Sequence, residues 1–242
     1  MNRTQALQSI NNTDVEVLIV GAGANGAGTF RDLALNKVKV LLIDKGDYCS
    51  GASSASSHMA HGGIRYLENG EFRLVREAVQ ERNRMIENAP HLVRPLPTVV
   101  PMFKLFSGLL NAPLKFLNLL NKPAERGAMV IKIGLIFYDS FTKQQKTVPP
   151  HSFDNAERSL QKFPKLSPDI KFTAKYYDGQ ILSPERFVTE LVTDGLAEGE
   201  HAQAFNYLSF EGVSNSQARL LDTVSGNTMT IKPRIIINAC GP

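Results

Sequence analysis

The sequence predicts an α/β fold, in which a largely parallel sheet carries helices and a second domain is inserted between its strands. Two apolar runs, 15–20 and 38–43, flank a segment with helical spacing that extends to about Lys37. The run 38–43 is nearly all apolar apart from Lys39, as expected for a strand that is covered on both faces of a parallel sheet. Residues 94–150 differ in character, since prolines and a long apolar stretch replace this regular order. A chain of 242 residues has room for one large domain or two small ones.

The turn after the first strand contains four glycines in residues 21–28. Gly21 lets the chain turn sharply, and Gly23 has no Cβ, so that backbone can approach a pyrophosphate. Gly26 lets the helix pack close to the strand, and the helix N-terminus directs unpaired N–H groups toward the phosphates. Asp44 lies 23 residues after Gly21, where its carboxylate can accept hydrogen bonds from ribose hydroxyls. The segment predicts a dinucleotide-binding unit, and a tight turn without any ligand is the alternative.

Composition narrows the classes of function. The formal charge of +4 and the isoelectric point near 9.0 fit an anionic cofactor, substrate or membrane surface, but no basic block predicts nucleic-acid binding. Cys49 and Cys240 are far apart and lack metal-ligand spacing, so we predict no metal site and a reduced, cytoplasmic setting. Residues 1–13 are polar, and we predict a flexible tail rather than a signal peptide. No apolar run reaches the roughly 18 to 20 residues that a membrane span needs.

A serine-rich segment follows the second strand. Five serines in 50–57, among them Ser53, Ser54 and Ser57, supply hydroxyls and exposed backbone N–H groups without bulk. A flexible surface linker is the alternative interpretation. The segment runs into His61-Gly62-Gly63 and then into apolar residues, which favours a return to packed structure.

Several motifs together resemble the FAD-dependent glycerol-3-phosphate dehydrogenase family. They are the serine pairs in 53–57, the run His-Gly-Gly-x-Arg-Tyr-Leu-Glu at 61–68, and shorter matches at 71–78, 88–93, 138–139, 176–179 and 237–242. The sequence departs from the family where His58 replaces the usual Lys, Cys240 replaces the usual Thr, and Asp44 replaces a frequent Glu. His58 alters the local electrostatics, because Lys is fully charged near neutral pH and His is close to its titration range.

This resemblance implies a domain organisation and a cofactor. The expected fold is an FAD-binding Rossmann-like domain of the glutathione-reductase or D-amino-acid-oxidase type, made of 14–95 and 180–242, with an inserted, incomplete α+β substrate domain at 96–179. Since the family's fold continues past Pro242, the chain is expected to be an N-terminal fragment that does not turn over substrate alone. The expected cofactor is FAD, and the residues expected to bind it are Gly21, Ala22, Gly23, Asn25, Gly26, Asp44, Lys45, Ser53, Ser54, Ser57, His61, Gly62, Gly63, Phe210, Ala239 and Gly241.

The resemblance also implies a reaction, the oxidation of sn-glycerol 3-phosphate to dihydroxyacetone phosphate with quinone as the electron acceptor. His61 is a candidate catalytic base; the alternatives are a structural hydrogen bond for His61 and a base beyond residue 242. Arg65 is a candidate for binding the anionic substrate. Residues 103–120 are apolar and punctuated by lysines, which suits a helix in the inner face of the cell membrane; a buried helical hairpin is the alternative.

The remaining elements follow from spacing and turn residues. Residues 71–88 show helical spacing before Pro90, and 96–101 are bounded by prolines and extended. Ser183-Pro184-Glu185 is typical of a helix start, and this helix extends to Gly199. The last expected elements are a strand over 203–210, a hairpin of 219–224 with 228–231, and a buried strand at 235–237.

Two rival functions stay open. One keeps the fold and makes the protein an oxygen-reducing glycerol-phosphate oxidase or a related flavin oxidase, which would release peroxide without quinone. The other is an inactive truncated fragment with at most nucleotide binding. A nicotinamide enzyme is disfavoured, because a simple NAD domain does not need the serine-rich and His-Gly-Gly segments. The sequence leaves the oligomeric state open, with a homodimer among the options.

Overall fold

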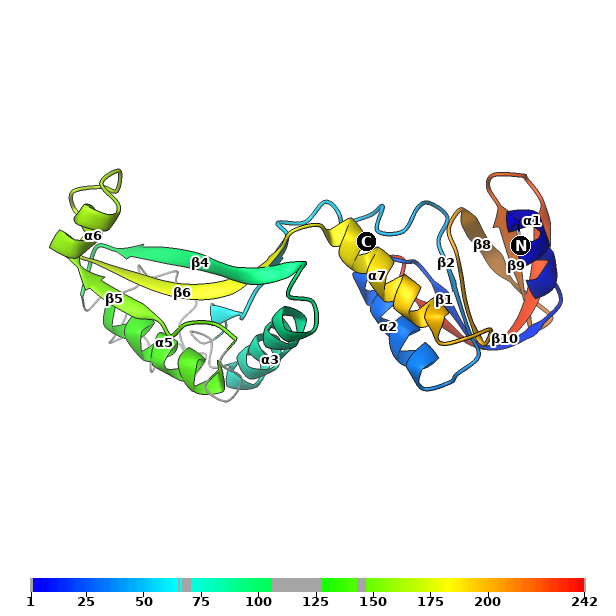
Figure 1. Cartoon of the computed structure of the whole chain (residues 1–242), viewed down its shortest axis with the longest axis horizontal. Coiled ribbons are helices and arrows are strands. Elements are labelled where there is room, and N and C mark those ends of the chain that lie inside the picture. Colours follow the sequence, from blue (N-terminus) through cyan, green and yellow to red (C-terminus); the bar gives the residue numbers. More distant parts are fainter. Residues whose placement is uncertain (1, 65, 67–70, 106–127, 143–146, 242) are drawn as a thin grey trace. The chain divides into compact units, whose positions relative to one another are not determined.

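The computed structural model describes residues 2–64, 66, 71–105, 128–142 and 147–241, and the chain divides into two compact units. Unit 1 consists of Met1–His58 and Ser183–Pro242, and unit 2 consists of Met59–Leu182. Figure 1 shows both units and labels their elements where there is room. The expected insert began at residue 96, but unit 2 begins at Met59. The strand at 59–60 pairs with a strand of the inserted unit, and the helix at 72–88 packs against the sheet of that unit.

Unit 1 is built on a sheet of six described strands in the order β7-β2-β1-β10-β9-β8. The pairings of β7 with β2, β2 with β1, and β1 with the second part of β10 are parallel, and β8, β9 and the first part of β10 form an antiparallel meander. Its helices are α1 (Arg3–Ile10), α2 (Ala24–Leu35) and α7 (Pro184–Ala197). Its strands are β1 (Asp14–Val20), β2 (Val40–Ile43), β7 (Ala202–Phe205), β8 (Leu208–Ser214), β9 (Gln217–Asp222) and β10 (Thr228–Asn238).

Two apolar clusters bury the two faces of β1. Ile19 belongs to a cluster with Phe30 of α2 and Val188 of α7, whereas its neighbour Leu18 belongs to a cluster with Leu220 of β9. Successive side chains of a strand point to opposite faces, so these clusters lie on opposite sides of the sheet. In β2, Leu42 belongs to the first cluster and Leu41 to the second, so the strand predicted at 38–43 with both faces covered is confirmed.

Residues 3–10 form α1, so the predicted flexible tail is wrong for them. The Asn2 side chain accepts a hydrogen bond from the Gln5 N–H at 2.9 Å, and the Asn2 N–H donates to the Gln5 side chain at 3.1 Å. This reciprocal capping box starts the helix. Leu7 and Ile10 are buried in the cluster of the second face. A stripe of only two apolar residues in a polar segment gives little periodic signal, which is why the sequence pattern missed it.

Unit 2 is an antiparallel sheet with helices packed against it (Figure 1). The central strand β6 pairs with β3, β4 and β5. Helices α3 and α5 pack on each other and on β6, and their shared core contains Val79, Leu135 and Ala174, all fully buried. The elements are β3 (Met59–Ala60), α3 (Phe72–Asn88), β4 (Val93–Met102), α5 (Ala128–Thr142), β5 (Ser152–Asn155), α6 (Ala156–Lys162) and β6 (Phe172–Ile181).

Several predicted elements are confirmed, and two are corrected. The helices at 71–88 and from Pro184 and the hairpin of 219–224 with 228–231 are present as α3, α7 and β9–β10. The strand predicted over 203–210 is two strands, because the chain bends at Asn206 and Tyr207 and Tyr207 has a φ of +53°.

The strand predicted at 235–237 is part of β10, but it is less buried than expected. Ile235 is 58% exposed and Ile236 is 38% exposed. Helix α2 packs over β1 and β2, and α7 packs over α2 and β7. The apolar stretch predicted at 103–120 lies outside the described residues from 106 onward. Across the described part of the chain, no helix has the length and apolar character to cross a bilayer.

Candidate functional site

The glycine turn connects β1 to α2, and its glycines have different surroundings. Gly21 has a φ of +106°, and a Cβ there would lie 2.4 Å from the Ala239 carbonyl oxygen. A Cβ on Gly26 would lie 1.8 Å from the Gly21 carbonyl oxygen. A Cβ on Gly23 would approach only the Ser53 hydroxyl, at 3.0 Å. Gly21 and Gly26 are therefore required by backbone packing, whereas Gly23 leaves open space in front of the helix.

The N-terminus of α2 faces this open space. The cap residue Gly23 has no side chain with which to satisfy the first-turn N–H groups. Ser53 Oγ accepts a hydrogen bond from the Ala24 N–H at 3.0 Å. The first turn of a helix combines N–H donors with the positive end of the helix dipole, and Asn25 lies in this turn of α2. The turn fits an anionic phosphate group, which is the role that the sequence predicts for it.

Asp44, at the end of β2, holds the glycine turn in place. Its Oδ2 accepts a hydrogen bond from the Ala22 N–H at 2.7 Å, and its Oδ1 accepts from the Gly46 N–H at 2.9 Å. Each carboxylate oxygen has a second lone pair, so the half-buried Asp44 retains capacity for ribose hydroxyls. The neighbouring Lys45 is exposed.

The serine-rich segment is folded back beside the same turn. The Cys49 N–H donates to the Ala22 carbonyl at 3.0 Å, and Ser54 Oγ donates to the Gly51 carbonyl at 2.9 Å. The His58 ring lies 3.1 Å from the Ser54 carbonyl oxygen, and Ser57 is exposed. These bonds favour an ordered series of turns over the flexible linker that was the alternative.

The connection from β7 to β8 borders the loop after Asp44. The Asp44 N–H donates to the Phe205 carbonyl at 3.1 Å, and the Leu208 N–H donates to the Asp44 carbonyl at 2.7 Å. Asn206 donates to Asp47, and this hydrogen bond, together with one from the Tyr48 N–H, holds the pKa of Asp47 below its ordinary value. Phe210, predicted to contact the cofactor, lies two residues beyond Leu208 and packs against the cluster of the second sheet face.

The residues after β10 complete the surroundings of the turn. The Ala239 N–H donates to the Val20 carbonyl at 2.8 Å, which brings Ala239 against Gly21. Gly241 has a φ of +79° and is exposed. Unit 1 therefore brings together the glycine turn, Asp44, Ser53 and Ala239, which are far apart in the sequence.

Unit 2 contains the His-Gly-Gly segment. The Gly62 N–H donates to Asp178 Oδ1 at 2.9 Å, and His61 Nδ1 lies 3.5 Å from Asp178 Oδ2. A Cβ on Gly62 would lie 2.0 Å from the Tyr138 hydroxyl, and Gly63 has a φ of +71°. Arg65 lies outside the described residues. Sequence reasoning assigned no role to Asp178, although its Tyr-Tyr-Asp-Gly motif was one of the matches to the family.

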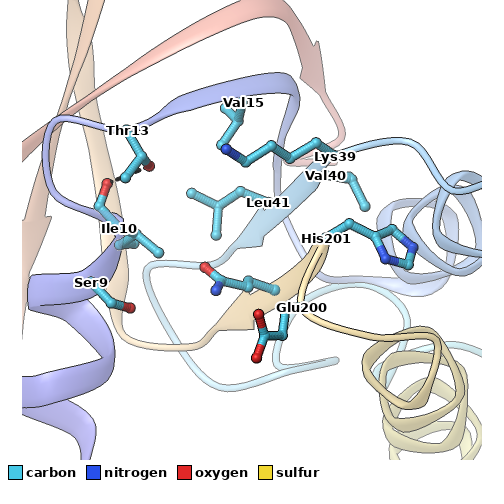
Figure 2. A pocket seen from close by; sticks show the side chains of 10 residues that line it. Ser9, Ile10, Thr13, Val15, Lys39, Val40, Leu41, Glu200 and His201 are labelled. Atoms are coloured by element: carbon cyan, nitrogen blue, oxygen red, sulfur yellow. Dashed lines mark hydrogen bonds between the residues drawn. The ribbon is translucent and has the colours of Figure 1, made fainter.

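A separate cavity of about 570 Å³ lies in unit 1 near the first residues of β1, β2 and β7. Figure 2 shows Leu41 near its centre, Lys39 reaching toward Val15, and Glu200 on another side. The glycine turn follows the last residue of β1, so this cavity lies at the other end of the parallel strands. It is distinct from the predicted dinucleotide site.

The comparison with protein families shows which family the chain belongs to. The family described as FAD dependent oxidoreductase matches residues 16–242. The chain belongs to this family. Its FAD-binding α/β fold was predicted from the sequence and is confirmed, as is FAD as the cofactor of the family.

Two similar proteins within this family are both glycerol-3-phosphate dehydrogenases by name. A glycerol-3-phosphate dehydrogenase of Synechocystis sp. is 35% identical over 242 residues, which are 96% of this chain and 40% of that protein. A probable mitochondrial glycerol-3-phosphate dehydrogenase of Caenorhabditis elegans is 30% identical over 95% of this chain and 30% of its own length. The chain therefore spans well under half the length of these relatives.

Solved structures share the fold of this FAD dependent oxidoreductase. The glycerol-3-phosphate dehydrogenase of Bacillus halodurans complexed with FAD has a TM-score of 0.66 and 20% identity, over 99% of this chain and 37% of that one. The FAD-bound L-alpha-glycerophosphate oxidase of Mycoplasma pneumoniae has a TM-score of 0.59 and 18% identity, over 92% of this chain and 53% of that one. At these identities, the likeness concerns the fold alone.

Proposed function

We propose that this chain holds FAD in a protein that oxidises sn-glycerol 3-phosphate to dihydroxyacetone phosphate. The observation that carries the proposal is the glycine turn, where the cap residue Gly23 has no side chain in front of the helix N-terminus and Asp44 fixes the backbone beside it. The 35% identity to a glycerol-3-phosphate dehydrogenase supports the substrate. The matches in the serine-rich and His-Gly-Gly segments point to the same family.

The residues present fit FAD. Gly23, Asn25 and Ser53 would receive the pyrophosphate, and Asp44 and Lys45 would bind the ribose side. We assign the rest of the cofactor contacts to Ser54, Ser57, His61, Gly62, Gly63, Phe210, Ala239 and Gly241. Bound FAD would supply the electron acceptor for oxidation of the alcohol.

His61 is the side chain that we propose as the base for the substrate hydroxyl. Its side chain is 58% exposed, so a ligand can reach the ring, and one ring nitrogen faces the Asp178 carboxylate. An imidazole can accept a proton near neutral pH, which suits an alcohol that loses its hydroxyl proton as it is oxidised. We propose Arg65 as a ligand of the substrate phosphate, because a guanidinium binds phosphate oxygens in pairs.

For the electron acceptor we propose a quinone at a membrane surface, with the protein bound peripherally. The lysine-punctuated apolar stretch at 103–120 supports contact with anionic head groups. Oxygen is the second candidate, since a glycerophosphate oxidase has the same fold. Reduced protein that re-oxidises with a soluble quinone in the absence of oxygen would support the first. Peroxide formed at a similar rate without quinone would support the second.

Titration with FAD tests the cofactor site. Gly23→Ala adds a methyl group where only the Ser53 hydroxyl is near, so the variant is expected to fold. We expect it to weaken FAD binding by more than about tenfold, because the methyl group blocks the phosphate from the helix N–H groups. Gly28→Ala is the matched control, since nothing lies within 4 Å of its Cβ. Equal FAD affinity for both variants would refute the assignment of the glycine turn.

A further inference from the structure

Asp178 is a buried acid at the centre of a hydrogen-bond network in unit 2. Its side chain is 3% exposed. Its Oδ1 accepts hydrogen bonds from the Gly62 N–H at 2.9 Å and from the Tyr138 hydroxyl at 3.1 Å. Its Oδ2 has a different neighbour, His61 Nδ1, at 3.5 Å. The two oxygens therefore divide their contacts: one fixes the backbone of the His-Gly-Gly segment, and the other faces the imidazole.

The network extends to a buried cation. Arg82 is 1% exposed and donates to the Tyr138 hydroxyl and to the Tyr177 carbonyl. Burial lowers the pKa of Arg82, while the nearby Tyr138 and Asp178 act in the opposite direction. Burial also raises the pKa of Tyr138, so its hydroxyl stays protonated and donates to Asp178. Arg82 thus supplies the positive charge that lets a carboxylate remain in this core.

Close packing against Tyr138 also restrains the His-Gly-Gly segment at Gly62. A Cβ on Gly62 would lie 2.0 Å from the Tyr138 hydroxyl and 2.5 Å from its ring. The backbone at residue 62 is therefore held on one side by the tyrosine and by a hydrogen bond to Asp178. His61 directly precedes this clamped residue, so its Cα position is fixed, while its side chain is 58% exposed.

We propose that Asp178 is a positioning residue for His61, and that it selects the imidazole tautomer with hydrogen on Nδ1 and a free lone pair on Nε2. A carboxylate is only an acceptor of hydrogen bonds, so the ring nitrogen that faces it must carry the hydrogen. The exposed Nε2 then becomes the atom that accepts a proton. This inference rests on the proposed function, in which His61 accepts the hydroxyl proton of the substrate.

The tautomer of the His61 ring distinguishes a positioning role of Asp178 from a role that only stabilises unit 2. A network that only stabilises unit 2 requires Asp178 to accept from Gly62 and Tyr138, but it places no demand on the His61 ring. In Asp178→Asn, the amide oxygen can still accept from Gly62 and Tyr138. The amide nitrogen then replaces Oδ2 and donates toward Nδ1, which requires the opposite tautomer.

Nitrogen-15 NMR of the histidine rings in the full chain tests the proposal. Spectra are recorded about two pH units above the ordinary histidine pKa of about 6.5, where the neutral ring predominates. For the unmodified protein, we expect the Nδ1–H form of His61 to exceed the Nε2–H form by about fivefold, because the Asp178 carboxylate 3.5 Å from Nδ1 attracts the N–H group. For Asp178→Asn, we expect the Nε2–H form to dominate.

A second histidine of unit 2 provides the control. His151 Nδ1 lies 2.7 Å from Asp139 Oδ2, so Asp139→Asn is expected to change the His151 tautomer and to leave that of His61 unchanged. A His61 ring without an Nδ1–H excess in the unmodified protein would overturn the proposal, whether or not the variants fold. FAD titration of the same samples is a separate measurement. If the unmodified protein shows the expected His61 tautomer but does not bind FAD, the proposed function is refuted and the role of Asp178 in setting the tautomer stands.

Discussion

Gly26 and Gly28 lie two residues apart in α2 and have opposite surroundings. A Cβ on Gly26 would stand 1.8 Å from the Gly21 carbonyl oxygen, which is backbone and has little freedom to move aside. A Cβ on Gly28 would meet nothing within 4 Å. Packing therefore requires the first glycine, whereas the second only costs backbone entropy in the helix.

We expect Gly26→Ala to destabilise unit 1 by about 3 kcal/mol or more, since the added methyl group forces α2 away from β1. We expect Gly28→Ala to raise the free energy of unfolding by up to about 1 kcal/mol. Urea unfolding of the two variants measures both effects. A similar loss of stability in both would show that the close approach at Gly26 is unimportant.

Asp222, at the end of β9, is a buried acid that accepts hydrogen bonds from Arg3, Ser225 and the Val224 N–H. Arg3 Nη2 donates to its Oδ1 at 2.8 Å, and Ser225 Oγ donates to its Oδ2 at 2.5 Å. Burial acts to raise the pKa of Asp222, but the hydrogen bonds from Ser225 and Arg3 outweigh it and hold that pKa below the ordinary value of 3.8. The ionised form is therefore favoured in the folded protein.

A lowered pKa in the folded state gives stability that is present above the pKa of the unfolded chain and is lost as pH falls through the folded value. We expect Asp222→Asn to lower the free energy of unfolding by about 1–3 kcal/mol at pH 7. The difference between variant and unmodified protein should shrink as pH falls below about 4. Chemical unfolding at a series of pH values measures this, and a difference independent of pH would contradict the assignment.

Single residues show how far the sequence predicts the site. The positive φ of Gly21 and the contact between Gly26 and Gly21 lie within the turn, so motif spacing predicts them, whereas the contact of Gly21 with Ala239 joins distant parts of the chain. Ser53 was predicted as a ligand residue, but its hydrogen bond to the Ala24 N–H depends on how a later segment folds back. Asp178 lies 116 residues from its partner Gly62, and no local pattern predicts a contact between residues so distant in the chain.

At the scale of elements, helix α1 could not be predicted from the polar composition of its segment. The segment is polar, and its helix depends on the capping box at Asn2 and Gln5 and on the burial of Leu7 and Ile10. A helix of eight residues is too short to be stable alone in water, so contact with the sheet holds it. By contrast, the start of α7 was predicted, because Ser183 and Pro184 act locally: the serine accepts from the Arg186 N–H.

We expect Leu7→Ala to cost about 2–4 kcal/mol of stability, because Leu7 is 6% exposed and its removal leaves a cavity between α1 and the meander. Gln8→Ala is the control, since Gln8 is exposed on the same helix and its change is expected to stay within about 0.5 kcal/mol. Thermal unfolding of both variants is the measurement. Equal melting temperatures would restore the interpretation of residues 3–10 as a flexible tail.

At the scale of the whole molecule, each of the two units has its own hydrophobic core, and unit 2 also contains a buried network of polar side chains. In unit 2, Arg82 joins α3 to α5 and β6 through Tyr138 and the Tyr177 carbonyl. The sequence predicted an inserted unit, but it placed the start of this unit near residue 96 instead of Met59. Spacing identified α3 as a helix, but the sheet that a helix packs against depends on contacts between distant residues.

We expect Arg82→Leu to destabilise unit 2 by about 3–5 kcal/mol, because Asp178 loses its compensating charge and the Tyr177 carbonyl loses a donor. Hydrogen exchange localises the effect. The amides of Val79 and Ala174, in the core of unit 2, should exchange faster, while those of Leu18 and Ile19 in unit 1 keep their protection. Faster exchange at all four amides would mean that the two units unfold together.

The parallel pairing of β1 with β10 constrains how the protein is made. Asp14 pairs with Lys232, so a ribosome must add 218 residues after Asp14 before its partner is complete. At about 5–20 residues per second, this takes roughly 10–45 s, during which one side of β1 stays without its neighbour. The continuous segment of unit 2 emerges within that interval and can complete its own fold first. Slower synthesis therefore prolongs the time for which this side of β1 is open to incorrect pairing.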